Sequence, residues 1–261
     1  MGYVFCMTAS LSNQRVVITG ASSGFGEAAA RAFAAEGCQV LLGARRVERL
    51  EKIASEIRQP GAGHALDVTR TASVEQFVEW VRAKTARVDV LINNAGGALG
   101  LDPVATGRDE DWETMLQTNV LGLLRVTRAV LPLMVNHPGG SILNIGSIAG
   151  RTAYEGGAVY CAAKAGERII TQALRLELNG TGLRVGSLDP GLAETEFSTV
   201  RFKGDEERAR KVYHGVHALT AEDIAEALVW MASRPPHVNI DELVIKPTDQ
   251  AAIHKVFRRA K

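Results

Sequence analysis

The stretch Thr19-Gly20-Ala21-Ser22-Ser23-Gly24-Phe25-Gly26 decides the fold of this 261-residue chain. It follows an apolar run at residues 15–19 that is typical of a buried strand, and it leads into an Ala-rich helical run at residues 26–36. A glycine-rich turn in this position lets the backbone approach a pyrophosphate, and the helix N-terminus adds oriented N–H groups and a positive dipole end. The same turn also occurs as a plain tight turn. We predict dinucleotide contacts at Gly20, Ser22, Ser23, Gly24, Phe25 and Gly26.

The rest of the chain alternates short β-rich runs with longer helical runs. Further strands are expected at residues 39–43, 64–68, 88–93, 141–145, 183–188 and 243–246. Helices are expected at 47–58, 73–84, 112–131, 159–178 and, from a capping box at 220–223, up to 231. This order predicts an α/β fold with a single domain: a Rossmann-type, doubly wound sheet of about seven mostly parallel strands with helices on both faces.

The domain boundaries follow from where this pattern begins and ends. Residues 1–10 are expected to be an N-terminal extension in which either Met1 or Met7 is the true start, and residues 251–261 are expected to be a C-terminal tail. The catalytic domain is expected at 11–250. Within it, residues 193–217 are polar and charged and lack strand character, so they are predicted to form a mobile lid over the substrate.

Composition excludes several classes of partner. The formal net charge is +1, so no global field favours nucleic acid or an anionic membrane. The cysteines Cys6, Cys38 and Cys161 are widely spaced and suggest no metal site. Reduced thiols, the lack of a signal-peptide pattern and the lack of a long apolar stretch predict a cytoplasmic protein. The expected partner is a small-molecule substrate.

The end of the second predicted strand indicates which dinucleotide binds. NAD sites carry an acidic residue here, to bind the ribose 2′-hydroxyl, but this chain has Ala44 followed by Arg45 and Arg46. Two guanidinium groups can pair with a 2′-phosphate. We therefore predict NADP(H), with NAD(H) as the weaker alternative. The two arginines also fit the start of a solvated helix, and Ser23 brings no charge into the glycine loop.

Three other strand ends are expected to reach the same crevice. Asp67 and Val68 follow the third strand and are predicted to lie near the adenine, although Asp67 also fits a helix cap. Asn93, Ala95 and Gly96 end the fourth strand, which suits the ligand crevice of a doubly wound sheet or an ordinary turn. After the sixth strand, Pro190 and Gly191 turn the chain and Thr195 is expected to bond the nicotinamide carboxamide.

A second group of residues is suited to moving a proton. Tyr160 and Lys164 share a helical face, and a nearby ammonium lowers the pKa of a phenol from its usual value of about 10. The pair is therefore a candidate acid/base, although this spacing is also common on protein surfaces. Ser147 follows the fifth strand and is placed to hold a substrate oxygen. Asn119 sits inside a predicted helix, where it either faces solvent or has a function.

These elements together resemble the short-chain dehydrogenase/reductase family over residues 11–250. The matching motifs are TGASSGFG, NNAG, Asn119, Ser147, YCAAK and Pro190-Gly191. The resemblance implies that Tyr160 is the acid/base, and that Lys164 lowers the pKa of Tyr160 and holds the ribose hydroxyls. It also implies that Ser147 orients the carbonyl and that Asn119 holds a water in a proton relay. A homotetramer is implied as well, with a dimer as the alternative.

Three segments, at residues 24–27, 190–205 and 244–250, resemble one branch of the family, the NADP-dependent 3-hydroxy acid dehydrogenases. The branch oxidises serine, allo-threonine and similar acids, which implies a cation for the substrate carboxylate. Arg151, Arg201 and Lys203 are the candidates, although each also fits an ordinary solvated charge. Two alternatives remain: a reductase of a bulkier ketone or bicyclic metabolite that resembles clavulanate dehydrogenase, and a non-catalytic NADP(H)-binding sensor.

Overall fold

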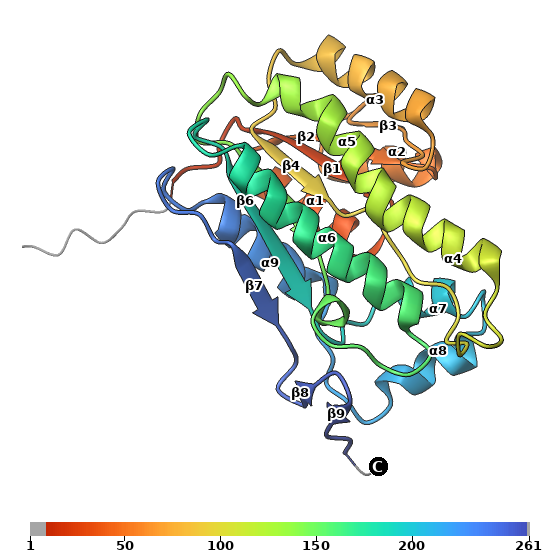
Figure 1. Ribbon diagram of the computed structural model, residues 1–261. Helices are drawn as coiled ribbons and strands as arrows, with labels where there is room; N and C mark the ends of the chain where they lie inside the picture. Colours follow the sequence, from red (N-terminus) through yellow and green to blue (C-terminus); the bar gives the residue numbers. More distant parts are fainter. Residues whose placement is uncertain (1–8, 260–261) are drawn as a thin grey trace, which may run out of the picture.

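The computed structural model describes residues 9–259 (Figure 1). Met1, Cys6 and Met7, and with them most of the predicted N-terminal extension, lie outside these residues. The last two residues of the predicted C-terminal tail lie outside them as well. Among the described residues no helix is both long enough and apolar enough to cross a membrane.

One parallel sheet forms the centre of the fold. Its seven strands run in the order β3-β2-β1-β4-β5-β6-β7, and every neighbouring pair is parallel. This confirms the predicted doubly wound sheet, and the winding reverses between β1 and β4, the position at which such sheets bind ligands. The strands are β1(Arg15–Thr19), β2(Gln39–Ala44), β3(Gly63–Ala65), β4(Val90–Asn93), β5(Ser141–Ile145), β6(Arg184–Pro190) and β7(Glu242–Ile245).

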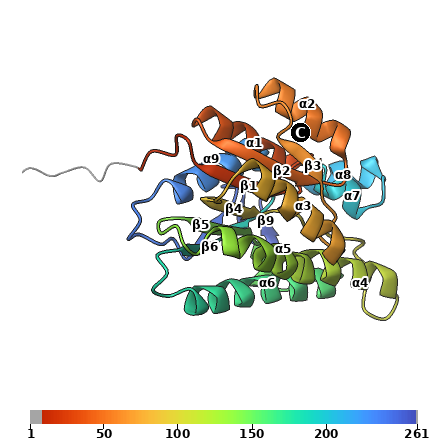
Figure 2. The ribbon, with the colours of Figure 1, turned by 90° about the horizontal axis from the view of Figure 1, so that it is seen from above.

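Helices cover both faces of the sheet (Figure 2). α1(Gly24–Ala35), α2(Val47–Glu56) and α9(Ala221–Ala232) pack on one face, and α3(Thr71–Lys84), α5(Gly122–Val130) and α6(Ala158–Glu177) pack on the other. Alternate strand residues supply the two cores: Val16 and Ile18 face the first set of helices, and Val17 faces the second. Because both faces are buried, the strands have apolar runs without polar alternation.

The helix predicted at 112–131 is not a regular α-helix. It divides into α4(Asp109–Leu116), a π-helical turn η1(Gln117–Leu121) and α5, followed by a 3₁₀ turn η2(Leu131–Leu133). Asn119 Nδ2 donates to the carbonyl of Met115 at 2.8 Å. A side chain that occupies a main-chain acceptor one turn back competes with the regular helical ladder. The π-helical turn therefore lies at the mid-helix asparagine that the sequence singled out.

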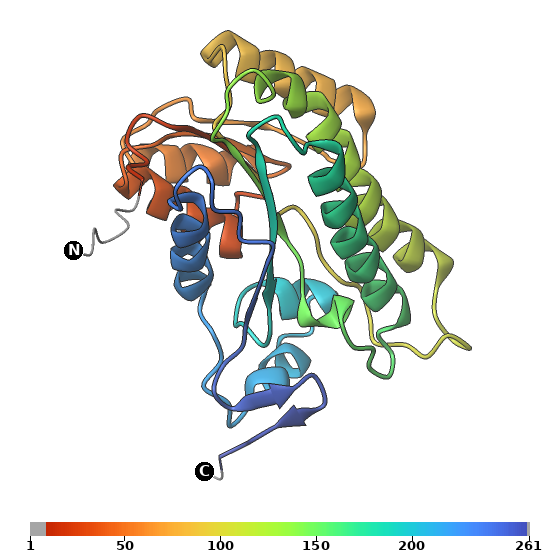
Figure 3. The same cartoon turned by 60° about the vertical axis from the view of Figure 1, so that its left-hand side comes forward.

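The segment predicted to be a lid contains two short helices, α7(Phe197–Arg201) and α8(Glu206–Tyr213). Part of the predicted C-terminal tail forms a hairpin from β8(Gln250–Ala252) and β9(Lys255–Val256). Figure 3 shows both features at the end of the sheet to which the strands point. The capping box predicted before α9 is confirmed, since Thr220 and Asp223 each bond the other's backbone N–H.

The turn between β1 and α1 passes close to the end of β4. Gly20 and Gly24 have φ angles of 64° and 55°, in the left-handed region that glycine adopts most easily. A Cβ atom on Gly26 would lie 2.5 Å from Asn94 Nδ2 and 2.6 Å from the carbonyl oxygen of Gly20. The first residues of α1 therefore fit against β4 only without a side chain at this position.

Gly26→Ala is expected to lower the free energy of unfolding by about 1–3 kcal/mol, because the added methyl overpacks this contact. Denaturant or thermal unfolding of the parent and the variant measures the difference. Gly166→Ala in α6 is the matched control, since a Cβ there meets only Val120 Cγ2, at 3.8 Å. If the two variants were equally stable, the close packing at Gly26 would not be a constraint.

Candidate active site

A cavity of about 350 Å³ opens at the carboxyl ends of the strands, where β1 and β4 diverge. The glycine loop, the ends of β2 to β5, one face of α6 and the lid segment all contribute to its wall. It brings together these predicted site residues: Gly20, Ser22, Ser23, Gly24, Phe25, Arg45, Arg46, Asp67, Val68, Ala95, Gly96, Tyr160, Lys164 and Thr195.

Arg46 reaches back over the glycine loop. Its Nη2 donates to Ser23 Oγ at 2.7 Å, and its Nε donates to Ser22 Oγ at 3.2 Å. The loop carries no basic residue of its own, so the side chain that follows β2 delivers a guanidinium to this point. The donors of the helix N-terminus and this guanidinium therefore lie beside the same part of the cavity, which suits a phosphorylated ribose and a pyrophosphate.

A lid residue that sequence reasoning missed also meets Arg46. Glu196 Oε2 accepts from Arg46 Nη1 at 3.0 Å, and its Oε1 accepts from Arg49 Nη1 at 2.7 Å. Burial raises the pKa of Glu196, but the hydrogen bonds from Arg49 and Arg46 outweigh it and hold that pKa below its usual value. The start of the lid is thereby tied to the start of α2 across the cavity.

Arg45 and Asp67 lie on the same wall of the cavity. Arg45 is exposed to solvent. Asp67 Oδ1 accepts from the backbone N–H and the hydroxyl of Thr69, at 3.0 and 2.7 Å. Burial raises the pKa of Asp67, whereas these hydrogen bonds and the charge of Arg45 lower it, with a net decrease. The carboxylate is held ionised with an orientation fixed by the turn that follows β3.

Four residues predicted to touch the cofactor do not line this cavity: Gly26, Asn93, Pro190 and Gly191. The buried amide of Asn93 donates to Thr127 Oγ1 and to Asn144 Oδ1, each at 2.9 Å, inside the core. Asn94 lines the cavity instead, and its amide donates to the carbonyl of Thr19 at 2.8 Å. Because side chains alternate along a strand, the one-residue offset decides which asparagine reaches the crevice.

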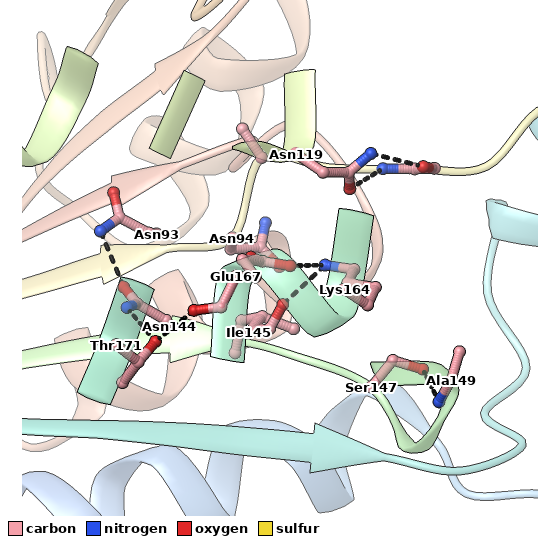
Figure 4. Close-up of polar contacts among 12 residues, drawn as sticks. Asn93, Asn94, Asn119, Asn144, Ile145, Ser147, Ala149, Lys164, Glu167 and Thr171 are labelled. Carbon is pink, nitrogen blue, oxygen red and sulfur yellow. Dashed lines mark hydrogen bonds and ion pairs between the residues drawn. The ribbon is translucent and has the colours of Figure 1, made fainter. Parts of the chain in front are cut away.

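Tyr160 and Lys164 line the far wall of the same cavity and are both buried, at 8% and 6% exposure. The ring of Tyr160 lies 5.7 Å from that of Phe197 in α7, centroid to centroid. Lys164 Nζ donates to the carbonyl of Ile145 at the end of β5, at 2.8 Å (Figure 4). This bond anchors the ammonium group between α6 and the sheet.

Lys164 has a carboxylate partner that sequence reasoning missed. Glu167 Oε2 lies 2.6 Å from Lys164 Nζ, and both side chains are almost fully buried. Burial raises the pKa of Glu167 to about 7, against the lowering effect of Lys164. For Lys164, burial lowers the pKa but Glu167 and Tyr160 outweigh it, so the pKa lies above its usual value. The i, i+3 spacing in the sequence is the signal that could have found the pair.

Ser147 and Asn119 lie next to the cavity without lining it. Ser147 Oγ accepts from the backbone N–H of Ala149 at 3.1 Å and caps the 3₁₀ turn η3(Ile148–Gly150). Asn119 holds the backbone of Gly97 with two hydrogen bonds, 3.1 Å from its N–H and 2.9 Å to its carbonyl. A Cβ on Gly96 would lie 2.6 Å from Asn119 Oδ1 and 3.5 Å from Lys164 Nζ. The amide oxygen of Asn119 and the ammonium of Lys164 therefore both lie beside Gly96.

The three predicted carboxylate-binding cations have different surroundings. Arg151 Nε donates to Asp189 at 2.7 Å, and Arg151 also pairs with Glu242. Lys203 pairs with Asp111 at 2.7 Å. These two cations are already neutralised.

Arg201 differs, because no carboxylate of residues 9–259 lies within ion-pair distance of it. Its Nη2 donates to the hydroxyl of Tyr154 at 2.8 Å, and its guanidinium carbon lies 5.7 Å from the ring centroid of Tyr160. Of the three cations, Arg201 is the one whose charge is available beside Tyr160.

Comparisons with known proteins agree with the motif pattern. The model of the short chain dehydrogenase family matches residues 14–206. The NADP-dependent 3-hydroxy acid dehydrogenase YdfG of Salmonella typhi is 48% identical over 237 residues, 90% of this chain and 96% of that protein. The sulfoacetaldehyde reductase of Chromohalobacter salexigens is 46% identical, over 90% of this chain and 94% of that protein. The closed form of a serine dehydrogenase complexed with NADP⁺ is 44% identical and superposes with a TM-score of 0.88, covering 95% of this chain and 100% of that chain. This chain belongs to the short-chain dehydrogenase family.

Proposed function

We propose that this protein is an NADP(H)-dependent oxidoreductase that interconverts a hydroxyl and a carbonyl group on a small 3-hydroxy acid such as serine or allo-threonine. The observation that carries the proposal is the common cavity: Tyr160 and Lys164 line it together with the glycine loop and Arg46. The names of the similar proteins, an NADP-dependent 3-hydroxy acid dehydrogenase and a serine dehydrogenase with bound NADP⁺, support the same cofactor and substrate class.

NADP(H), when bound, supplies or accepts the hydride, and the protein provides orientation and proton transfer. Tyr160 is the acid/base at the substrate oxygen, and Lys164 lines the cavity beside it, one helical turn further along α6. Lys164 also binds the ribose hydroxyls. Ser147 holds the substrate oxygen where charge develops, and Asn119 holds a water that relays a proton to Lys164.

The cavity wall supports NADP(H) over NAD(H). Gly20 and Gly24 leave room for the pyrophosphate, and Arg46 lies over Ser23 beside the cavity. Arg45 faces the same space and is exposed, so it is free to turn toward a 2′-phosphate. At the end of β2, where an NAD site carries an acidic residue, this chain has Ala44 followed by Arg45 and Arg46.

Arg201 is the group we assign to the acidic end of the substrate. It belongs to the lid, lies beside Tyr160 and has no carboxylate partner within residues 9–259. A carboxylate bound by a guanidinium forms charge-assisted, often bidentate hydrogen bonds. The similarity to a sulfoacetaldehyde reductase is compatible with this role, since a sulfonate is also an anion that a guanidinium binds.

The proposal includes a cytoplasmic homotetramer. Apolar side chains are exposed on the outer faces of the long helices, where copies would pack: Leu116, Leu121, Leu124, Ile169 and Leu176. Cys38 and Cys161 are unpaired thiols, which fits a reducing compartment. The molecular mass in solution, from light scattering, separates a tetramer from a dimer.

Tyr160→Phe is expected to lower kcat at least about 100-fold while cofactor affinity stays close to that of the parent, because only the acid/base is removed. Steady-state rates and NADPH binding by fluorescence measure the two effects. Unchanged turnover in Tyr160→Phe would contradict the assignment of Tyr160 as the acid/base. A parent protein that binds NADPH but turns over no substrate would favour the sensor alternative.

The double variant Arg45→Ala/Arg46→Ala is expected to raise KM for NADP at least about tenfold, since a hydrogen bond to a charged group contributes about 1.5–3 kcal/mol. KM for NAD should change much less. Arg49→Ala is the matched control, because Arg49 binds Glu196 but does not line the cavity. Equal effects on KM for NADP and for NAD would show that the two arginines do not bind the 2′-phosphate.

Arg201→Gln is expected to raise KM for serine, 3-hydroxypropionate and other anionic substrates at least about tenfold, with little effect on neutral ketones. Lys203→Gln is the control, since it removes another cation of the same segment, one that is paired with Asp111. NADPH absorbance across a substrate panel provides the rates. A parent that turns over only bulky neutral ketones or bicyclic compounds would contradict the 3-hydroxy acid assignment.

A further inference from the structure

The ion pair between Lys164 and Glu167 lies entirely inside the protein. The two residues are three positions apart on α6 and share a helical face, with Nζ and Oε2 2.6 Å apart. Their side chains are 6% and 4% exposed. A buried ammonium that has lost its hydration tends to release its proton unless a charge or hydrogen bonds compensate. The carbonyl of Ile145 is one such compensation, and the carboxylate of Glu167 is the other.

Few other charged groups face this pair. Asp189 on β6 is another carboxylate whose charge acts on both residues, and its own charge is paired with Arg151 at 2.7 Å. Tyr160 faces Lys164 from the preceding turn of α6. Within residues 9–259, Lys164 is the only cation in an ion pair with Glu167, and Glu167 Oε2 has no hydrogen-bond partner besides this ammonium. The carboxylate is therefore directed at the lysine alone.

The polar side chains of Thr171, Asn144 and Asn93, which lie near Glu167, hydrogen-bond to one another and not to its carboxylate. Thr171 Oγ1 donates to the backbone carbonyl of Glu167 at 2.8 Å, and Asn144 Nδ2 donates to Thr171 Oγ1 at 2.8 Å (Figure 4). Asn144 Oδ1 in turn accepts from Asn93. These bonds fix one turn of α6 against β4 and β5. They hold the backbone of Glu167 in place but give its carboxylate no partner.

We propose that Glu167 is a positioning residue for the reaction: it is the counter-ion that keeps buried Lys164 in its ammonium form and fixes its Nζ beside Tyr160. The inference rests on the catalytic role proposed above for Lys164. It adds that Lys164 keeps its positive charge inside the protein because the buried carboxylate of Glu167 offsets the desolvation of the ammonium.

The pH range in which this counter-ion acts follows from its own ionisation. Burial raises the pKa of Glu167 to about 7, so its carboxylate is charged above that pH and gains a proton below it. At acid pH Lys164 stays protonated without help. At alkaline pH, where a buried lysine tends to lose its proton, Glu167 is charged and holds that proton in place. Removing the Glu167 carboxylate should therefore lower activity at alkaline pH.

The test is the pH profile of kcat/KM for the parent and for Glu167→Gln, which keeps the shape and removes the charge. We expect the activity of the variant to fall at alkaline pH, with a midpoint about one to three pH units below the alkaline midpoint of the parent. Glu167→Asp should keep the parent's alkaline profile. Glu177→Gln is the matched control, since it removes an exposed charge about 15 Å further along α6.

A profile of unchanged shape in Glu167→Gln, with activity lowered evenly or not at all, would overturn the proposal and leave Glu167 a packing residue. A shift of the profile to higher pH would also overturn it.

A second measurement tests the ion pair through stability and does not require the Gln variant to fold. In a double-mutant cycle, Lys164→Met and Glu167→Met should each destabilise the protein, and the double variant should be more stable than their sum predicts. Additive effects would overturn the ion-pair assignment. If Lys164→Met kept full turnover while the cycle was non-additive, the catalytic proposal would fail and the ion pair would stand.

Discussion

The close approach of the β1–α1 turn to the end of β4 is the contact on which the rest of the site depends. Gly26 lets the first turn of α1 lie against Asn94, and the amide of Asn94 binds the carbonyl of Thr19. The N-terminus of α1 is thereby held at the point where the sheet reverses its winding. Every other part of the cavity wall is positioned relative to this junction, because the neighbouring strands are fixed to β1 and β4 by their parallel register.

α6 connects this junction to the residues proposed to move a proton. One face of the helix packs on the core through Leu174, and its first turns carry Tyr160 and Lys164 to the cavity. The bond from Lys164 to Ile145 joins the helix to β5. The residues proposed to move a proton are therefore carried on regular structure, whereas Arg201, the group proposed for the substrate, belongs to the segment predicted to be a lid. A rigid helix beside a less regular cover suits a family that keeps one reaction and varies the molecule that undergoes it.

The fold could be predicted from the sequence because both faces of the sheet are buried, which leaves apolar runs separated by helices of clear periodicity. Most of the residues that line the cavity could also be predicted, since they follow strand ends. The π-helical turn could not be predicted, because it coincides with a hydrogen bond from the Asn119 side chain to the Met115 carbonyl that the apolar periodicity does not show. Asn93 was predicted to line the cavity, but Asn94 lines it. At the end of a strand, neighbouring side chains point in opposite directions, and the sequence does not show which one points into the core. Glu167 was missed because a charged helical residue reads as solvent-facing until packing shows that it is buried.

The contact of Glu196 with Arg46 and Arg49 has a consequence for how the lid responds to its surroundings. All three side chains are about 40% exposed, so mobile ions reach them, and at physiological ionic strength charges are screened over about 8 Å. The tie between the segment predicted to be a lid and the start of α2 therefore weakens as salt concentration rises. The interior pair on α6 is shielded from the same ions. Ionic strength therefore acts on the exposed ion pairs of Glu196 more strongly than on the buried ion pair between Lys164 and Glu167.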